Sequence, residues 1–181
     1  MLKRTRGYVL LTLLVLTGFA GQVSNQTISS KERTLLVSRL KVSKQALLKS
    51  LDDITPAQLT FKAGTSETTI GDKILMLNAT QTALLANVDA AINGGKNSTI
   101  DLYSLPKNST PDFNDLIDEV KATQSFLVKY AKTTTEDLHA HTLKTTAGPV
   151  DAYQALLTLP VLTENCLAEI EALKKHRRFP K

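Results

Sequence analysis

Three histidines are the first side chains to examine for chemistry, because imidazole binds metals and exchanges protons near neutral pH. His139 and His141 lie two residues apart, a spacing that points their side chains apart in a helix. His176 lies in a basic C-terminal tail. Neither arrangement predicts a metal site, and we expect a surface role for all three.

The remaining reactive side chains do not form a catalytic set. Cys166 is the one cysteine, so it cannot form an internal disulfide, and it has no neighbouring His or Lys to lower its pKa. Its place on an apolar helical stripe favours a buried thiol over an intermolecular disulfide. Asp151 and Glu164 are candidate acids, but neither has a second carboxylate at a defined distance. Tyr153 with Gln154 predicts structural hydrogen bonds, and the sequence predicts no catalytic residue.

The N-terminus has the pattern of a secretory signal peptide. Three cations in the first six residues precede an apolar run from Tyr8 to Leu16, followed by small residues up to Ala20. The run is too short to span a bilayer, which needs about 20 residues. We expect a signal peptide over 1–20, cleavage near Ala20 and export. An uncleaved membrane anchor is the alternative, and no Cys follows the run to carry a lipid.

The charge of the chain becomes mild once the signal peptide is removed. The formal net charge of +5 includes those three cations, so the mature chain carries +2. This excess is too small to favour nucleic acid as a partner. The remaining sequence is long enough for one domain with a sizeable core, and we expect no stable membrane span after cleavage.

Apolar residues recur at helical spacing in four long segments, which predicts an all-α four-helix bundle. A flexible lead-in is expected over 21–28, and the bundle over 29–181. The expected helices run from Ser29 to about Leu51, from Thr69 to about Ile92, from Asp112 to about Thr133, and from Pro149 to Lys175. In the last helix, the stripe that faces the core is formed by Leu162, Cys166, Ile170 and Leu173.

Shorter signals predict the breaks between these helices. Thr55 before Pro56 is typical of a short helical turn. Thr135 is expected to cap another short turn through His139, and Leu143–Gly148 is expected to be a loop. Pro160 lacks an N–H inside the last helix, so it should kink or split that helix.

Several short motifs in a fixed order carry a resemblance to a known family. They are Glu32-Arg33, Leu51 with Gln58-Leu59, Thr69-Ile70-Gly71-Asp72, Leu138-His139-Ala140-His141, Gly148 through Gln154, Glu169-Ile170 and Phe179-Pro180. Together they make residues 29–181 resemble the DinB-like superfamily of four-helix bundles, which includes bacillithiol transferases and mycothiol-dependent isomerases. The resemblance implies the same bundle and a homodimer formed by helices packed side by side.

The resemblance also implies where a metal would sit. Active members of that family carry three histidines that hold Zn²⁺ or Ni²⁺, one on the second helix and two four residues apart on the last. Matched residue by residue, these positions fall on Met76, Leu162 and Cys166. Leu offers no lone pair, and a Met–Cys pair suits only a soft ion such as Cu(I). We expect apolar filling of the former site and no cofactor, with soft-metal binding as the alternative.

Three functions remain open at this point. The favoured one is an exported bacterial DinB-like bundle that has lost its metal and acts by binding or assembly rather than as an enzyme. The second is a divergent metal- or thiol-dependent transferase or hydrolase, which predicts a deep polar pocket near Met76 and Cys166 with His141 reaching into it. The third is a membrane-surface protein held by an uncleaved N-terminus.

Overall fold

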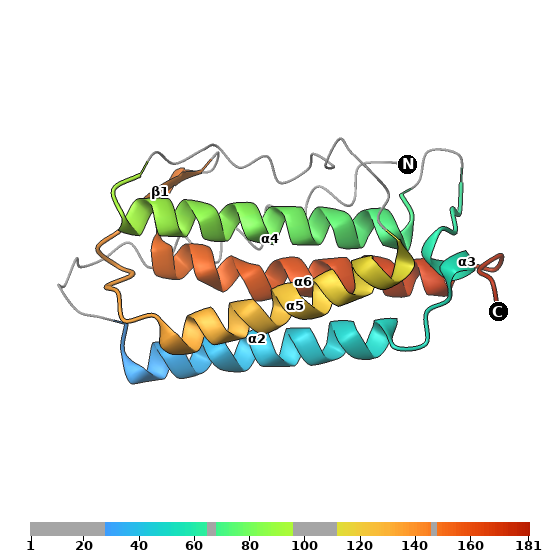
Figure 1. The fold of residues 1–181 in the computed structure, drawn as a ribbon, viewed down its shortest axis with the longest axis horizontal. Helices are drawn as coiled ribbons and strands as arrows, with labels where there is room; N and C mark the ends of the chain where they lie inside the picture. The colour runs from blue at the N-terminus through green and yellow to red at the C-terminus, as the bar shows by residue number, and fades with distance from the viewer. Residues whose placement is uncertain (1–27, 65–67, 96–111, 146–147) are drawn as a thin grey trace.

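A computed structural model describes residues 28–64, 68–95, 112–145 and 148–181. The expected signal peptide and all but the last residue of the lead-in lie outside these ranges. The described helices are α2 (Ser30–Leu51), α3 (Pro56–Leu59), α4 (Ile70–Ile92), α5 (Phe113–Thr133) and α6 (Ala152–Lys174). The four long helices pack lengthwise side by side (Figure 1), which confirms the predicted four-helix bundle.

Side chains just before each helix explain where the helices begin. Ser29, Thr55, Thr69 and Asp151 each accept a hydrogen bond from the backbone N–H three residues ahead, and the residue at that position bonds back to the cap. These reciprocal bonds satisfy N–H groups that have no partner within the helix. The predicted start of the first helix at Ser29 and the predicted short turn at Thr55 are thereby confirmed.

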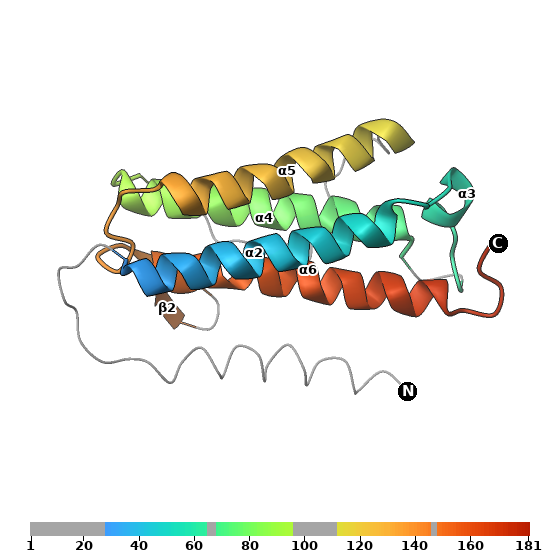
Figure 2. The ribbon, with the colours of Figure 1, turned by 90° about the horizontal axis from the view of Figure 1, so that it is seen from below.

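The long helices form two parallel pairs that run in opposite directions. α2 and α6 run parallel, because Arg39 contacts Glu164 and, further along both helices, Ser50 contacts Glu171. α4 and α5 also run parallel to each other, in the opposite direction (Figures 1 and 2). The end of α4 and the start of α5 therefore lie at opposite ends of the bundle, as in bundles with a crossover connection. α6 packs mainly against α2 and α4.

A β-hairpin, rather than a loop and a helix start, leads into α6. β1 (Thr142–Thr145) pairs antiparallel with β2 (Gly148–Asp151), and Leu143 lies opposite Val150. The expected loop at Leu143–Gly148 and the expected helix start at Pro149 are both wrong. Burial of Leu143 holds β1 against the bundle, and Gly148 at φ 120° adopts a backbone conformation that other residues avoid.

The structure also bears on the segment after α5 and on Pro160. The segment from Thr135 to His139 is not helical, and its turn is closed by the Ala140 N–H bonding to the Asp137 carbonyl at 3.1 Å. α6 is not split, because it continues through the buried Pro160 as one helix. Buried side chains lie on both sides of the proline, and their packing offsets the loss of one backbone hydrogen bond, which costs about 3 kcal/mol in a helix interior.

The apolar core has two parts, one toward each end of the bundle. The first includes Leu36, Leu40 and Leu156, and the second includes Ile74 and Ile170. Ile28 is buried in the first part, so the core includes a residue that precedes the expected boundary at 29. Within the described ranges, no helix has the length and apolar character that crossing a membrane requires.

Candidate functional site

The three positions matched to the family's histidines lie on α4 and α6. Cys166 is buried in the apolar cluster that also contains Ile74 and Ile170, while Leu162 is partly buried and packs against both core clusters. Met76 is partly exposed on α4. Leu162 has no atom that can donate electrons to a cation, so these three side chains do not fit a zinc or nickel site.

The surroundings of Cys166 hold its sulfur as a thiol. Its S–H donates to the Lys73 carbonyl, with Sγ 3.7 Å from the oxygen. Burial and the nearby charge of Glu169, opposed by that of Lys73, raise the pKa of Cys166 to about 12. Only the thiolate is a strong metal ligand or nucleophile. Cys166 is therefore poorly suited to metal binding and to thiol chemistry at neutral pH.

A layer of buried polar side chains crosses the middle of the bundle, between the two apolar clusters. All four long helices contribute to it, through Ser43 on α2, Asn78 and Gln81 on α4, Gln124 on α5 and Thr163 on α6. Each of these side chains is at most 2% exposed. Buried polar groups destabilise a core unless they are hydrogen-bonded, so the bonding of this layer decides its role.

Gln81 is the centre of the hydrogen bonds in this layer. Its Nε2 donates to the Leu159 carbonyl at 3.1 Å and to the Thr163 hydroxyl at 2.9 Å. Its Oε1 accepts from Gln124 Nε2 at 2.7 Å. One side chain of α4 thus joins α5 and α6, which fixes the relative register of three helices.

The sequence does contain a signal for this layer, which is an interruption of the apolar stripe in each long helix. In each long helix a polar residue stands between buried apolar residues, where the next member of the stripe would be expected. Examples are Gln81 between Leu77 and Leu84, and Gln124 between Val120 and Leu127. A gap in one stripe is common, but a gap near the middle of all four predicts a shared polar layer.

The densest group of titratable side chains lies at the end of the bundle where α2 and α6 begin. His139 is placed between two carboxylates, with Nδ1 3.0 Å from Asp151 Oδ2 and Nε2 3.2 Å from Glu32 Oε1. Tyr153 lies against the imidazole, with ring centroids 5.1 Å apart, and its hydroxyl donates to the Glu32 carbonyl at 3.3 Å. His139 is therefore a partly exposed side chain that bridges two carboxylates, a contact that the sequence does not predict.

The two carboxylates set the charge of this end cluster, which we define as Glu32, His139, Asp151 and Tyr153. Burial alone would lower the pKa of His139, but the hydrogen bonds and charges of Asp151 and Glu32 outweigh it and raise that pKa. Burial would raise the pKa of Glu32, but bonds from Ser29 and the charge of His139 lower it. Both shifts favour an imidazolium bridging two carboxylates.

The end cluster acts as a structural clamp. Glu32 belongs to the capping box of α2, and Asp151 is the N-cap of α6. His139 therefore ties the segment after α5 to the starts of two other helices. Its ring separates the two carboxylates, and within the described ranges no group of three or more His, Cys, Asp or Glu side chains is arranged to hold a metal ion.

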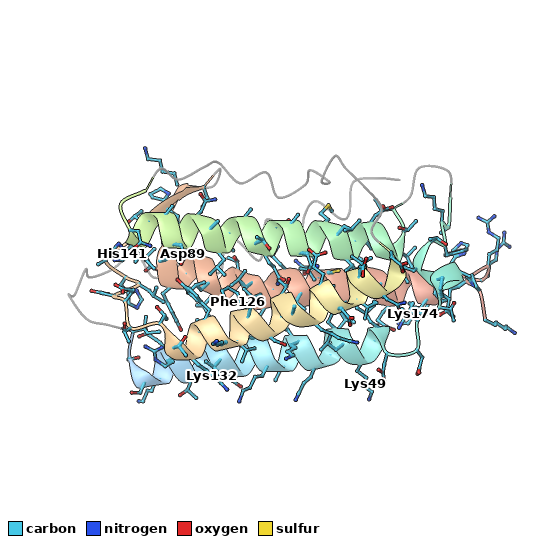
Figure 3. The ribbon with its side chains drawn as sticks, viewed as in Figure 1. Lys49, Asp89, Phe126, Lys132, His141 and Lys174 are labelled. Atoms are coloured by element: carbon cyan, nitrogen blue, oxygen red, sulfur yellow. The ribbon has the colours of Figure 1, made fainter. Side chains whose placement is uncertain are left out.

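The other two histidines do not reach the family's metal positions. His141 Nδ1 lies 3.2 Å from the Ala91 carbonyl, at the end of the bundle that also holds Asp89 (Figure 3). His176 packs against Phe61, with ring centroids 5.6 Å apart, near the C-terminus. The enzyme hypothesis placed His141 in a polar pocket beside Cys166, and the structure places it at the far end of α4 instead.

Comparisons with known proteins bear on the fold. No protein-family model matches the chain, and no curated protein matches it by sequence. Among solved structures, the chain is similar to YfiT from Bacillus subtilis, which is described as a probable metal-dependent hydrolase with an unusual four-helix bundle topology. The match has a TM-score of 0.68 and 12% identity, and it covers 90% of this chain and 97% of YfiT. At this identity the likeness concerns the fold, which is that of a four-helix bundle of the YfiT type.

Proposed function

We propose that this protein is an exported DinB-like bundle that has lost the family's metal site and acts by binding or assembly. The observation that carries the proposal is the pair Leu162 and Cys166 at the family's ligand positions on α6. Leu162 has no donor atom, and Cys166 is a buried thiol that donates to a backbone carbonyl. A hydrolase of the metal-dependent kind would need at least three good ligands at an open site.

The proposal is tested by metal titration of the mature chain. Isothermal titration with Zn²⁺, Ni²⁺ and, under reducing conditions, Cu(I) is expected to show no stoichiometric complex tighter than about 10 μM, because one thiol and one thioether are too few ligands. A tight complex of one ion per chain would overturn the proposal.

A variant that restores the family ligands provides the matched control. Met76→His, Leu162→His and Cys166→His together place three imidazoles at the matched positions. We expect this variant to bind Zn²⁺ at least 100-fold more tightly than the natural chain, since histidine is the ligand the family uses there. Failure of the folded triple variant to bind would show that these positions do not correspond to the family's site.

The face that we propose for assembly is the outer side of α2, with a second copy of the chain as its partner. Leu35 and Val42 are 50% and 62% exposed, and their seven-residue spacing is typical of a seam between two helices. Lys31, Lys41 and Lys49 lie along the same helix and are exposed, Lys49 being marked in Figure 3. Two copies joined through α2 would bring like charges together, so salt should strengthen the pairing.

Sedimentation equilibrium tests this assembly. The natural chain is expected to dimerise more tightly at about 0.5 M salt than at about 0.05 M, because screening weakens repulsion between lysines. Val42→Glu should abolish the dimer, whereas Ala86→Glu on the exposed side of α4 should leave it intact. A monomer at all salt concentrations would contradict assembly through α2 without affecting the metal experiment.

Export is the remaining part of the proposal. Mass spectrometry of the protein recovered from the producing cell should give a chain that starts near Gly21 if residues 1–20 are a cleaved signal peptide. A full-length chain in the membrane fraction would instead support the uncleaved anchor.

A further inference from the structure

Two amide side chains in the middle of the bundle have polar atoms without a partner in the protein. Both Nδ2 and Oδ1 of Asn78, and Oε1 of Gln124, are fully buried and bond to no protein atom. Asn78 is 2% exposed and Gln124 is 1% exposed. Native proteins rarely leave buried polar atoms in this state, so each calls for a physical explanation.

Exchanging the oxygen and nitrogen atoms of an amide side chain does not give these atoms a partner. The Leu159 carbonyl can only accept, so Gln81 must present Nε2 to it. Gln81 Oε1 then faces Gln124 and can only accept, so Gln124 must donate through its Nε2. Gln124 Oε1 is therefore left needing a donor. Exchanging the two ends of Asn78 changes nothing, because both ends lack a partner.

The two incomplete amides lie close to the same level of the bundle. Two hydrogen bonds relate the parallel helices α4 and α5. Gln81 bonds to Gln124, 43 residues later, and Asp89 bonds to Tyr130, 41 residues later. The same offsets place Asn78 level with residues 119–121 of α5, about one helical turn from Gln124. Asn78 and Asp89 also share a stripe of α4, and Asp89 bonds to α5, so this stripe faces that helix.

We propose that the bundle holds one or two internal water molecules between α4 and α5 at this level. A water can donate to Gln124 Oε1 and to Asn78 Oδ1 and can accept from Asn78 Nδ2, which satisfies every incomplete atom. Internal waters typically make about three hydrogen bonds to buried polar groups of this kind. A metal ion fits less well, because the groups are neutral amides and one of them is a donor.

The hydration site gives the polar layer a second link between α4 and α5. Gln81 and Gln124 join the two helices directly, and the water joins them one turn away. These helices run parallel and are separated by residues 93–112 in the sequence, so their register depends on contacts between the helices themselves. Two polar links at different heights would resist sliding of one helix along the other.

Nuclear magnetic resonance of the folded natural chain tests the proposal in solution. The side-chain amide protons of Asn78 and Gln124 should show cross-peaks to water with the sign expected for a bound water, resident for longer than about a nanosecond. The Gln81 amide, whose donors bond to protein atoms, should show none of comparable strength. A cross-peak between the Asn78 and Gln124 side chains without one to water would overturn the proposal in favour of a direct amide bond.

A crystal structure at about 1.5 Å or better provides the second measurement. We expect a water peak within hydrogen-bond distance of Gln124 Oε1 and of the Asn78 amide. The peak should be lost in Asn78→Leu and kept in Ser43→Ala, because the Ser43 hydroxyl bonds to the carbonyl of Leu40 in its own helix. No peak in the natural chain, or a peak unchanged in Asn78→Leu, would overturn the proposal.

Discussion

The polar layer in the middle of the bundle and the end cluster both join helices that are far apart in sequence, but they do so by different physics. The layer is neutral and at most 2% exposed, so its strength comes from hydrogen bonds that are shielded from bulk solvent. The end cluster is charged, and the His139 side chain is 29% exposed, so solvent weakens its ion pairs. The layer should therefore dominate stability, and the cluster should make stability depend on pH.

Loss of the central amide should have the largest effect. Gln81→Leu removes the acceptor of Gln124 and leaves both ends of that buried side chain without a protein partner. We expect the free energy of unfolding, measured with urea, to fall by about 2–4 kcal/mol. Ser43→Ala is the matched control in the same layer and should lower it by less than about 1 kcal/mol. Equal losses in the two variants would contradict the central role of Gln81.

Removing both members of the amide pair should restore part of that loss. In Gln81→Leu with Gln124→Leu neither member of the pair remains as a buried amide without its partner, and the Thr163 hydroxyl still bonds to the Leu159 carbonyl. We expect the free energy of unfolding of the double variant to lie within about 1–2 kcal/mol of that of the natural chain and to exceed that of Gln81→Leu alone. Additive losses in the urea experiment would show that packing, rather than hydrogen bonding, governs the layer.

The end cluster should give a smaller effect that changes with pH. The pKa of His139 is raised above its ordinary value of 6.5, so its stabilisation is complete below that pH and is lost as pH rises through the folded-state pKa. The pKa of Glu32 is lowered from its ordinary value of 4.5. The stability that Glu32 contributes is therefore complete above about pH 4.5 and is lost as pH falls through the folded-state pKa. The window of full contribution is therefore about pH 4.5 to 6.5.

His139→Ala measures this contribution directly. We expect it to lower the free energy of unfolding by about 1–2 kcal/mol near pH 6, and by less as pH rises above the folded-state pKa. Asp151→Asn keeps a good helix cap but removes one charge, so it should flatten the pH dependence without abolishing the helix start. A difference between the natural chain and His139→Ala that stays constant from pH 5 to 9 would rule out a charged bridge.

The smallest effect is expected at the edge of the end cluster. Tyr153→Phe removes the hydroxyl that donates to the Glu32 carbonyl at 3.3 Å but keeps the ring against His139. We expect a loss of about 0.5 kcal/mol in thermal or urea unfolding. The loss should not vary between pH 5 and 8, because burial and the charges of Glu32 and Asp151 raise the pKa of Tyr153 to about 12.

Local signals in the sequence determined the helices and most of their ends. Ser29, Thr55 and Thr69 cap helices where the pattern predicts, and Asn93 with Gly94 ends α4, the glycine adopting φ 69°. Such features depend on a few neighbouring residues, so one sequence is enough to find them. The start of α6 was misplaced because the strand at Pro149 is made by pairing with β1, which is a tertiary contact.

Which polar groups meet depends on how the helices pack in three dimensions. Gln81 and Gln124 are 43 residues apart, and Glu32 and His139 are 107 residues apart, so nothing local relates either pair. Their contacts depend on α4 and α5 running parallel and on α2 and α6 starting at the same end. Hydrophobic spacing specifies that a helix has a buried face, but it does not specify helix direction or neighbours, and those two choices place both polar groups.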